Sequence, residues 1–340
     1  MTMRQLLVST WDWNPILVGI CLVALLSYAE LTPGRRLSRS GCFFTGVAVF
    51  FLTLASPVNF LAAGYLFSAH MLQHLLLLLV VPPLMLLGLP EWKIKGPEPA
   101  KFGAGLVTKS RSAGVLAGLG HRNAQKLRSW SKFARFKPTR RRRSGLKSTL
   151  SFGFRSSFAR IRIHPFAAWL AGLSAMWIWH ERSLCDVATT TQIGRVIQII
   201  SLVVLGTLFW WPIVGPQTDR RLAPPLGIVY LFSACVGCTI LGILITFAPA
   251  GAVCPAFLHP LDQLGVLPLV QEQWGITPAK DQQIGGLMMW VPACGIYLSG
   301  VITLLTRWYR SGEATFAEPQ KTVNEPAPVF SPVRTTRERA

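Results

Sequence analysis

Long apolar blocks separated by short polar segments recur along the chain. Seven blocks are long enough, or nearly so, to cross the ~30 Å hydrocarbon core of a bilayer as a helix. They cover Pro15–Leu31, Gly41–Ser56, Phe60–Leu89, Pro165–His180, Ile193–Val214, Leu226–Phe247 and Gln283–Thr306. The second and fourth blocks are short and need flanking residues to complete a span. The pattern predicts an all-α, polytopic transmembrane helical bundle of about seven spans.

The chain divides into four parts of different composition. Residues 1–90 hold the first three predicted spans, and residues 164–308 hold the other four. Between them, residues 91–163 are rich in Lys, Arg, Gly and Ser, and residues 309–340 form a tail rich in Pro and charge. We expect the connecting segment to be flexible or to lie on a membrane surface, and the tail to be disordered.

Composition and charge support the membrane assignment. Only 14% of the 340 residues are charged, whereas a soluble domain carries about a quarter. The net charge is +20, and residues 91–163 supply +17 of it through 19 Lys/Arg against two Glu. Because no aromatic–basic fold pattern accompanies this charge, we expect the basic loop to bind anionic lipid, and we do not expect nucleic acid to be a partner.

The basic residues also predict an orientation, because Lys and Arg are enriched in cytoplasmic loops. They fall in alternate connections, while the connections between carry few of them. Outside the segment 91–163, the basic residues that decide this are Arg35, Arg36, Arg39, Arg220, Arg221, Arg307 and Arg310. The amino terminus is therefore predicted to lie outside the membrane and the carboxyl terminus in the cytoplasm.

Polar side chains within the predicted spans are costly and are usually paired or functional. His70 and His74 are four residues apart and share a helix face, with Gln73 beside them. The predicted topology places this face in the outer half of the bundle, with His180 at the outer end of the fourth span. The start of the seventh span brings further polar and sulfur side chains to the same side, namely Asp281, Gln282, Met288 and Met289.

Imidazole, thioether and carboxylate groups in one place are typical transition-metal ligands, and thioether favours Cu(I). We therefore predict an outward-facing copper site with the ligands His70, His74, His180, Asp281 and Met288. Gln73, Gln282 and Met289 would surround these ligands and orient them. Because two histidines can also ligate haem, a haem site stays open.

Each of these residues also has a simpler interpretation. The histidines are suited to hydrogen bonds between helices or to the membrane interface, the methionines to core packing, and Asp281 to capping the seventh helix. Cys235 and Cys238 form a lone CxxC motif, which is a weak metal signal. The sequence leaves open whether Cys185 and Cys254 pair. It contains no nucleophile–base pair and no phosphate loop, so we do not predict an enzyme.

Four runs of the sequence resemble one known family. They are HMLQHLLLLLVVPPLMLLGLP (70–90), HPFAAWLAGLSAMWIWH (164–180), LFWWPIVGP (208–216) and DQQIGGLMMWVP (281–292). These runs resemble the CtaG family of caa3-type cytochrome c oxidase assembly factors, which are polytopic bacterial membrane proteins. The resemblance covers roughly residues 15–90 and 164–308. It implies a bacterial cytoplasmic (inner) membrane location, oxidase subunits as partners and a role in making haem–copper oxidase that includes copper handling.

The chain departs from the family pattern in two places. After His180 the family tends toward Pro-x-Leu-Tyr-Asp, whereas residues 182–186 read Arg-Ser-Leu-Cys-Asp. Family members also often carry histidine near the start of the fifth span, where this chain has Gln192, Arg195 and Gln198. Fewer imidazoles weaken the prediction of a metal site. A copper or small-solute transporter and a metal-independent scaffold for oxidase subunits therefore stay open as alternatives.

Overall fold

A computed structural model describes residues 2–32, 37–91, 163–259, 262 and 264–323 of the chain. These residues form helices and connecting turns, with no strand among them. The all-α prediction is therefore confirmed for the described part of the chain. The expected flexible, lipid-bound loop falls almost wholly on residues 92–162, and most of the expected disordered tail on 324–340, which lie outside the described residues.

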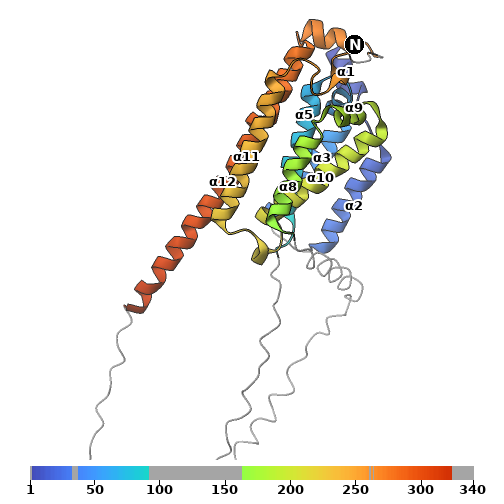
Figure 1. The fold of residues 1–340 in the computed structure, drawn as a ribbon. Helices are drawn as coiled ribbons and strands as arrows, with labels where there is room; N and C mark the ends of the chain where they lie inside the picture. The colour runs from blue at the N-terminus through green and yellow to red at the C-terminus, as the bar shows by residue number, and fades with distance from the viewer. Residues whose placement is uncertain (1, 33–36, 92–162, 260–261, 263, 324–340) are drawn as a thin grey trace, which may run out of the picture. The chain divides into compact units, whose positions relative to one another are not determined.

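Apolar helices form at all seven predicted blocks (Figure 1). They are α2 (Pro15–Leu31), α3 (Leu37–Ala55), α5 (Phe67–Leu75) with the π-helical turn η1 (Leu76–Val80) and α6 (Val81–Gly88), α8 (Pro165–Ile178), α10 (Gln192–Val214), α11 (Pro224–Phe247) and α12 (Pro278–Val323). Four stretches are long and apolar enough to cross a membrane, namely Phe67–Gly88, Gln192–Val214, Pro224–Phe247 and Pro278–Arg310. The apolar parts of α2, α3 and α8 are shorter than a typical span.

Several short helices were not predicted from the hydrophobic pattern. They are α1 (Met3–Ser9), α4 (Pro57–Ala62), α9 (Arg182–Thr190), the 3-10 turns η3 (Thr218–Arg220) and η4 (Pro255–Phe257), and the π turn η5 (Leu269–Gln273). Helix α9 is amphipathic, since only Cys185 and Ala188 are buried along it. The Glu181 side chain begins this helix by accepting hydrogen bonds from the amides of Ser183 and Leu184.

The third predicted span begins seven residues too early. The chain first forms α4, turns through Gly64 with a positive φ, and starts α5 only at Phe67. At the other end of the chain, α12 continues to Val323, past the predicted span end at Thr306 and into the segment predicted to be disordered. Helix-favouring residues such as Glu313, Ala314 and Ala317 follow the apolar part, so helix propensity outlasts hydrophobicity there.

A π-helical turn interrupts the third apolar helix directly after the segment that carries the histidines. Pro82 and Pro83 follow this turn, and neither has a backbone N–H to donate to the preceding turn. The amide of Val81 instead bonds to the carbonyl of Leu76, five residues earlier. Wide turns of this kind are frequent at functional sites.

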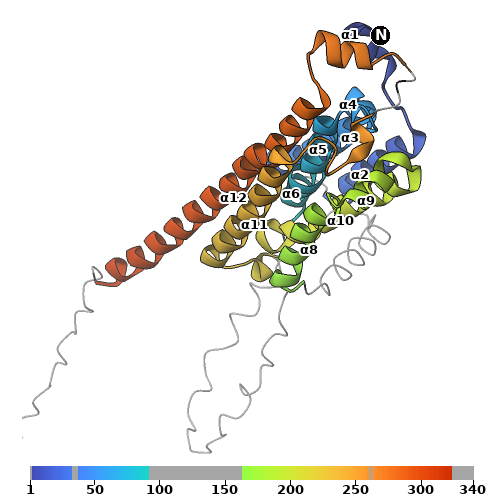
Figure 2. The ribbon, with the colours of Figure 1, turned by 45° about the horizontal axis from the view of Figure 1, so that its top comes forward.

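Helices α11 and α12 run side by side as a long antiparallel pair (Figures 1 and 2). Small residues allow their close approach, since a Cβ at Gly242 would lie 2.8 Å from Cβ of Trp290. Helix α5 packs against α12, α8 against α10, and α3 against α6. Helix α12 thus packs directly against α5, which carries His70 and His74, and α10 packs against η1 and α6, which continue α5.

Three of the connections predicted to be cytoplasmic meet at one end of the bundle. Glu91 lies 3.1 Å from a guanidinium nitrogen of Arg39 and 3.0 Å from one of Arg221. These ion pairs join the first, third and fifth connections, as the alternating charge pattern predicts. We call the end marked by Glu91, Arg39 and Arg221 the basic end, and the end where His70 lies the histidine end.

The two ion pairs of Glu91 at the basic end, which we call the charge clamp, make a testable contribution to stability. Burial raises the pKa of Glu91, but hydrogen bonds from Arg221 and Arg39 outweigh it and lower the pKa below its usual value of 4.5. A lowered folded-state pKa stabilises the protein above pH 4.5 and ceases to do so as pH falls through the folded value. We expect Glu91→Gln to cost about 0.5–1 kcal/mol at pH 7, because the pair is partly exposed.

The measurement is the thermal unfolding midpoint of the purified protein at a series of pH values from 7 to about 3.5, a range that includes the acid limb expected from this linkage. The difference between wild type and Glu91→Gln should shrink at the acid end. Glu272→Gln, at an exposed glutamate, is the matched control and should leave the midpoint unchanged. A wild-type-to-variant difference that does not depend on pH would contradict the clamp.

Candidate metal centre

Three histidines meet at the histidine end of the bundle. His70 and His74 lie on α5, and His180 lies two residues beyond the end of α8. The ring centroids of His70 and His74 are 4.5 Å apart, and those of His74 and His180 are 5.2 Å apart. All three side chains are buried, with 2%, 2% and 7% of their surface exposed. The structure thus brings together three of the five predicted ligands, which we call the histidine cluster.

Backbone carbonyls orient two of these rings. Nδ1 of His70 lies 3.2 Å from the carbonyl oxygen of Ala62, and Nδ1 of His180 contacts that of Met176. Because a carbonyl oxygen only accepts hydrogen bonds, each Nδ1 carries the proton and each Nε2 keeps its lone pair. The two Nε2 atoms are therefore in the state that binds a metal ion.

His74 is the least satisfied polar group of the cluster. Both of its ring nitrogens are buried, and neither makes a hydrogen bond of normal geometry among the described residues, although the side chain of Gln198 lies close to the ring. A buried polar group without a partner is costly, about 1–3 kcal/mol, and calls for an explanation such as a bound ion or water. His74 lies between His70 and His180, so an ion bound there would satisfy it.

Met71 joins the cluster although the sequence analysis did not select it. Its sulfur lies 3.0 Å from Nε2 of His180, and the side chain is fully buried. Both atoms present lone pairs, so their contact favours a cation that binds both. With metal–nitrogen and metal–sulfur bonds of ~2.0 and ~2.3 Å, a 3.0 Å separation corresponds to an angle of about 90° at the ion. The sequence could have revealed Met71 as a neighbour of the histidines, because Met71, His74 and Leu75 are spaced to share one face of the helix.

Gln198 on α10 approaches the cluster from another side. Its side-chain nitrogen lies 3.4 Å from Nε2 of His70, and Gln198 is almost wholly buried. This is one of the positions near the start of the fifth span where the sequence carries no histidine. The structure therefore shows that this position faces the histidine cluster.

The predicted ligand Asp281 contacts the backbone of α5. Its two carboxylate oxygens accept hydrogen bonds from the amides of Phe67 (2.6 Å) and Ser68 (3.0 Å). Asp281 therefore caps a helix, as the alternative interpretation proposed, but it caps α5 and not its own helix α12. In this position it anchors the first turn of the helix that carries His70.

The other predicted residues of the seventh span lie away from the described contacts of the three rings. Gln282 donates to the carbonyls of Ala248 and Pro249 and accepts from the amide of Gly251, so it holds the end of α11. Met289 is buried, and its carbonyl accepts a hydrogen bond from Cys238. Met288 is half-buried.

Gln73 points toward α3 and α4. Its amide donates to the carbonyl of Thr53 (3.3 Å) and to the side chain of Asn59 (3.0 Å). Arg195 donates to the same Asn59 side chain at 2.8 Å. Gln73 thus links the histidine helix to a polar network and does not contact the rings through these bonds.

This network borders a cavity of about 610 Å³ at the histidine end. Most of its lining is polar or small, and the residues that matter here are Asp12, Asn59, Thr191 and Arg195. Arg195 lies one helical turn before Gln198, which contacts His70. The cavity, which Arg195 lines, is therefore separated from the histidine cluster by one helical turn of α10 and the contact between Gln198 and His70.

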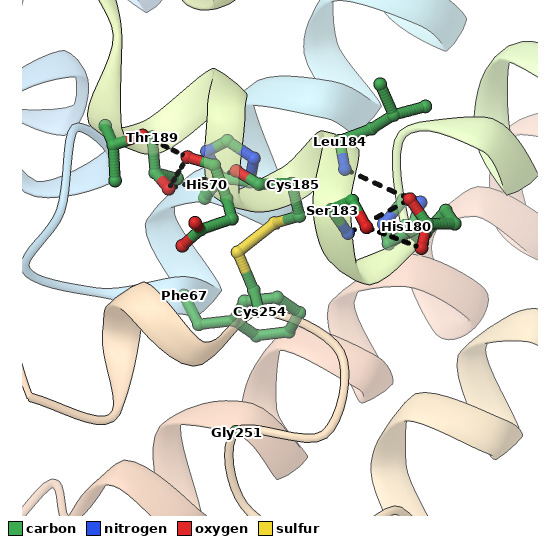
Figure 3. The surroundings of a disulfide bond; sticks show 12 residues. Phe67, His70, His180, Ser183, Leu184, Cys185, Thr189, Gly251 and Cys254 are labelled. Carbon is green, nitrogen blue, oxygen red and sulfur yellow. Dashed lines mark hydrogen bonds between the residues drawn. A yellow bond between two sulfur atoms is a disulfide. The ribbon is translucent and has the colours of Figure 1, made fainter.

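A disulfide closes the cluster on another side. Cys185 of α9 and Cys254 are bonded, and His70, His180 and Phe67 lie around them (Figure 3). Phe257, three residues after Cys254, packs against His70 with ring centroids 5.5 Å apart and against Phe67 at 5.7 Å. The pairing left open by the sequence is therefore present, and it holds an aromatic cover over His70.

The distances between the three imidazole rings are compatible with binding to one metal ion. Two imidazoles bound to one ion through ~2.0 Å bonds have ring centroids about 4.5–5.2 Å apart for angles of about 90–110°, and the cluster has this spacing. Within the described residues, however, no group of three or more His, Cys, Asp or Glu side chains is arranged to hold a metal ion. The donor types and spacing fit copper, while the ring orientations would have to adjust.

Comparison with known proteins identifies the class. Residues 22–311 match the sequence profile of the cytochrome c oxidase caa3 assembly factor family (Caa3_CtaG), and the chain belongs to this family. Uncharacterized proteins of Mycobacterium bovis and Mycobacterium tuberculosis are 23% identical to the chain over 310 residues, and one of Mycobacterium leprae is 22% identical. These matches cover 89% of the chain but 40% of each relative. No solved structure matches the chain.

Proposed function

We propose that the protein assists assembly of caa3-type cytochrome c oxidase by binding or delivering copper at the histidine cluster, without catalysing a reaction. Family membership supports the assembly role. The observation that carries the copper role is the buried, unpartnered imidazole of His74 between two further histidines. The sulfur of Met71 adds a soft donor beside them.

In this proposal His70, His74, His180 and Met71 hold the ion. Bound copper would be the cargo for a metal centre of the oxidase, and three neutral imidazoles with one thioether suit Cu(I). Ala62 and Met176 fix the Nδ1 protons, so both Nε2 atoms stay available. Asp281 would support the site by fixing the start of α5 and would not be a ligand.

The proposal includes an orientation in a bacterial cytoplasmic membrane. The disulfide lies at the histidine end, and disulfides persist in oxidising compartments outside the cytoplasm. Arg39 and Arg221 mark the opposite end, as expected for the cytoplasmic side. The histidine cluster and its polar cavity would then face the extracytoplasmic side of the membrane.

The test is the copper content of the purified protein, measured by mass spectrometry of the metal. We expect His70→Ala/His74→Ala to lose the copper that wild type retains after dialysis against a weak chelator. His259→Ala, at an exposed histidine, is the matched control and should keep it. Gln198→His should bind copper more tightly, because it supplies a further imidazole next to His70.

Folding is controlled by comparing size-exclusion profiles and circular dichroism of all variants. In cells, the wild-type chain and the double variant would be compared for the copper content of the assembled oxidase. Equal copper in the purified double variant and wild type would refute binding at this cluster. Full oxidase metallation supported by the double variant would refute the delivery role.

A further inference from the structure

Three cysteine side chains meet where α11 and α12 pack together. The sulfurs of Cys235 on α11 and Cys294 on α12 are 2.9 Å apart. Cys238 lies one helical turn from Cys235 and donates its S–H to the carbonyl of Met289. All three are free thiols. The lone CxxC of the sequence thus gains a third cysteine from the opposite helix.

The thiols lie in the middle of two long apolar helices. Gly242 and Trp290 pack on the histidine side of them, and Gly227 and Leu304 on the side of the basic end. Cys238 is fully buried, whereas Cys235 and Cys294 are half-buried. A single buried Cys usually behaves as a small hydrophobe, but here two free thiols from different helices are in direct sulfur–sulfur contact.

We propose that Cys235 and Cys294 form a second metal site, which binds a soft monovalent ion between two sulfur ligands. Thiol sulfur selects Cu(I) over the harder divalent ions. A two-ligand site also needs no third side chain, in keeping with the lack of larger metal-binding groups among the described residues.

Binding of Cu(I) to the two thiols needs no oxidant or reductant. As each Cu–S bond forms, an S–H bond releases its proton to solvent, and copper stays in the +1 state throughout. The hydroxyl of Thr239 donates to the carbonyl of Cys235 and lies 3.2 Å from the sulfur of Cys294, so it would have to turn from that carbonyl to donate a hydrogen bond to the thiolate. With metal–sulfur bonds of ~2.3 Å the two sulfurs can lie up to ~4.6 Å apart, so binding separates them by rotation about their Cα–Cβ bonds.

Residues of α5 and α12 lie between this site and the histidine cluster. Met71 contacts His180 and packs against α12 at Gly285, where an added Cβ would lie 3.1 Å from Cγ of Met71. One turn further along α12 is Met289, whose carbonyl accepts from Cys238. The assignment of copper, rather than another soft ion, rests on the function proposed above.

The test is titration of the reduced, detergent-solubilised protein with Cu(I) under anaerobic conditions, in competition with a coloured Cu(I) chelator. We expect Cys235→Ser/Cys294→Ser to lose one equivalent of bound Cu(I), together with near-ultraviolet absorption from sulfur-to-copper charge transfer. Cys42→Ser, at a half-buried thiol on α3, is the matched control and should retain both. His70→Ala/His74→Ala should retain the thiol-dependent equivalent.

A second measurement does not depend on the variants folding. In the wild-type protein, Cu(I) should slow maleimide labelling of Cys235 and Cys294 at least about tenfold and leave Cys42 unaffected. Undiminished stoichiometry in the double cysteine variant would overturn the proposal, as would a Cys235–Cys294 disulfide in membranes alkylated before lysis. If His70→Ala/His74→Ala loses an equivalent of Cu(I) and Cys235→Ser/Cys294→Ser loses none, the thiol site is refuted. If Cys235→Ser/Cys294→Ser loses an equivalent and His70→Ala/His74→Ala loses none, the histidine site is refuted and the thiol site stands.

Discussion

Replacing Cys185 and Cys254 together by serine is expected to lower the thermal unfolding midpoint more than any surface change in this chain. The disulfide joins residues 69 positions apart. In the chain-entropy description, closing a loop of that length in the unfolded state stabilises a protein by about 4 kcal/mol. Membrane embedding already restricts the unfolded chain, so this value is an upper figure.

The disulfide also has a local role that the same variant tests. It ties α9, which follows His180, to the segment whose Phe257 covers His70. Without this tie, the segment that carries Cys254 and Phe257 should open and expose the histidine end. We expect hydrogen exchange to accelerate in residues 250–258 and around His180, while α2 and α3 exchange as in wild type.

Reduction of the wild-type protein supplies a matched experiment without mutation. A mild reductant should lower the unfolding midpoint of wild type and leave that of Cys185→Ser/Cys254→Ser unchanged. Cys21→Ser, at a buried free thiol of α2, controls for substitution of a cysteine as such. An unfolding midpoint that responds neither to reduction nor to the double substitution would contradict the stabilising role.

The apolar helices were predictable because a bilayer demands long uncharged segments. The predicted bounds of α2 are those observed, and those of α10 and α11 differ by at most two residues. Prediction failed where helix ends depend on tertiary contacts. The start of α5 is fixed by Asp281, which is 214 residues away in the sequence, and no local pattern reveals that partner.

The histidine cluster was partly predictable for the same kind of reason. His70 and His74 share a face by helix periodicity, and the topology brought His180 to the same end. Met71 was not selected, and Gln198 was noted only as a position without histidine, because their contact with the rings depends on how α5, α8 and α10 pack. The Cys235–Cys294 contact likewise depends on the register of two helices.

Asp281→Ala is expected to destabilise the histidine end strongly. The substitution removes both hydrogen bonds to the amides of Phe67 and Ser68 and leaves a buried helix start without a cap. Loss of a charged cap at a buried position costs about 2 kcal/mol. The unfolding midpoint should fall, and amide exchange in the first turn of α5 should accelerate, whereas Gln283→Ala at an exposed neighbouring position should change neither.

Asp281→Asn separates the cap from the ligand role predicted from the sequence. The asparagine side chain keeps one oxygen that accepts a hydrogen bond from a helix amide, so most of the capping should persist. Its neutral amide is a much poorer copper ligand than a carboxylate. If Asp281 serves as a cap, Asp281→Asn should bind copper as wild type does. If Asp281 binds copper directly, the variant should lose metal as His70→Ala/His74→Ala does, while the unfolding midpoint of the metal-free protein stays near that of wild type.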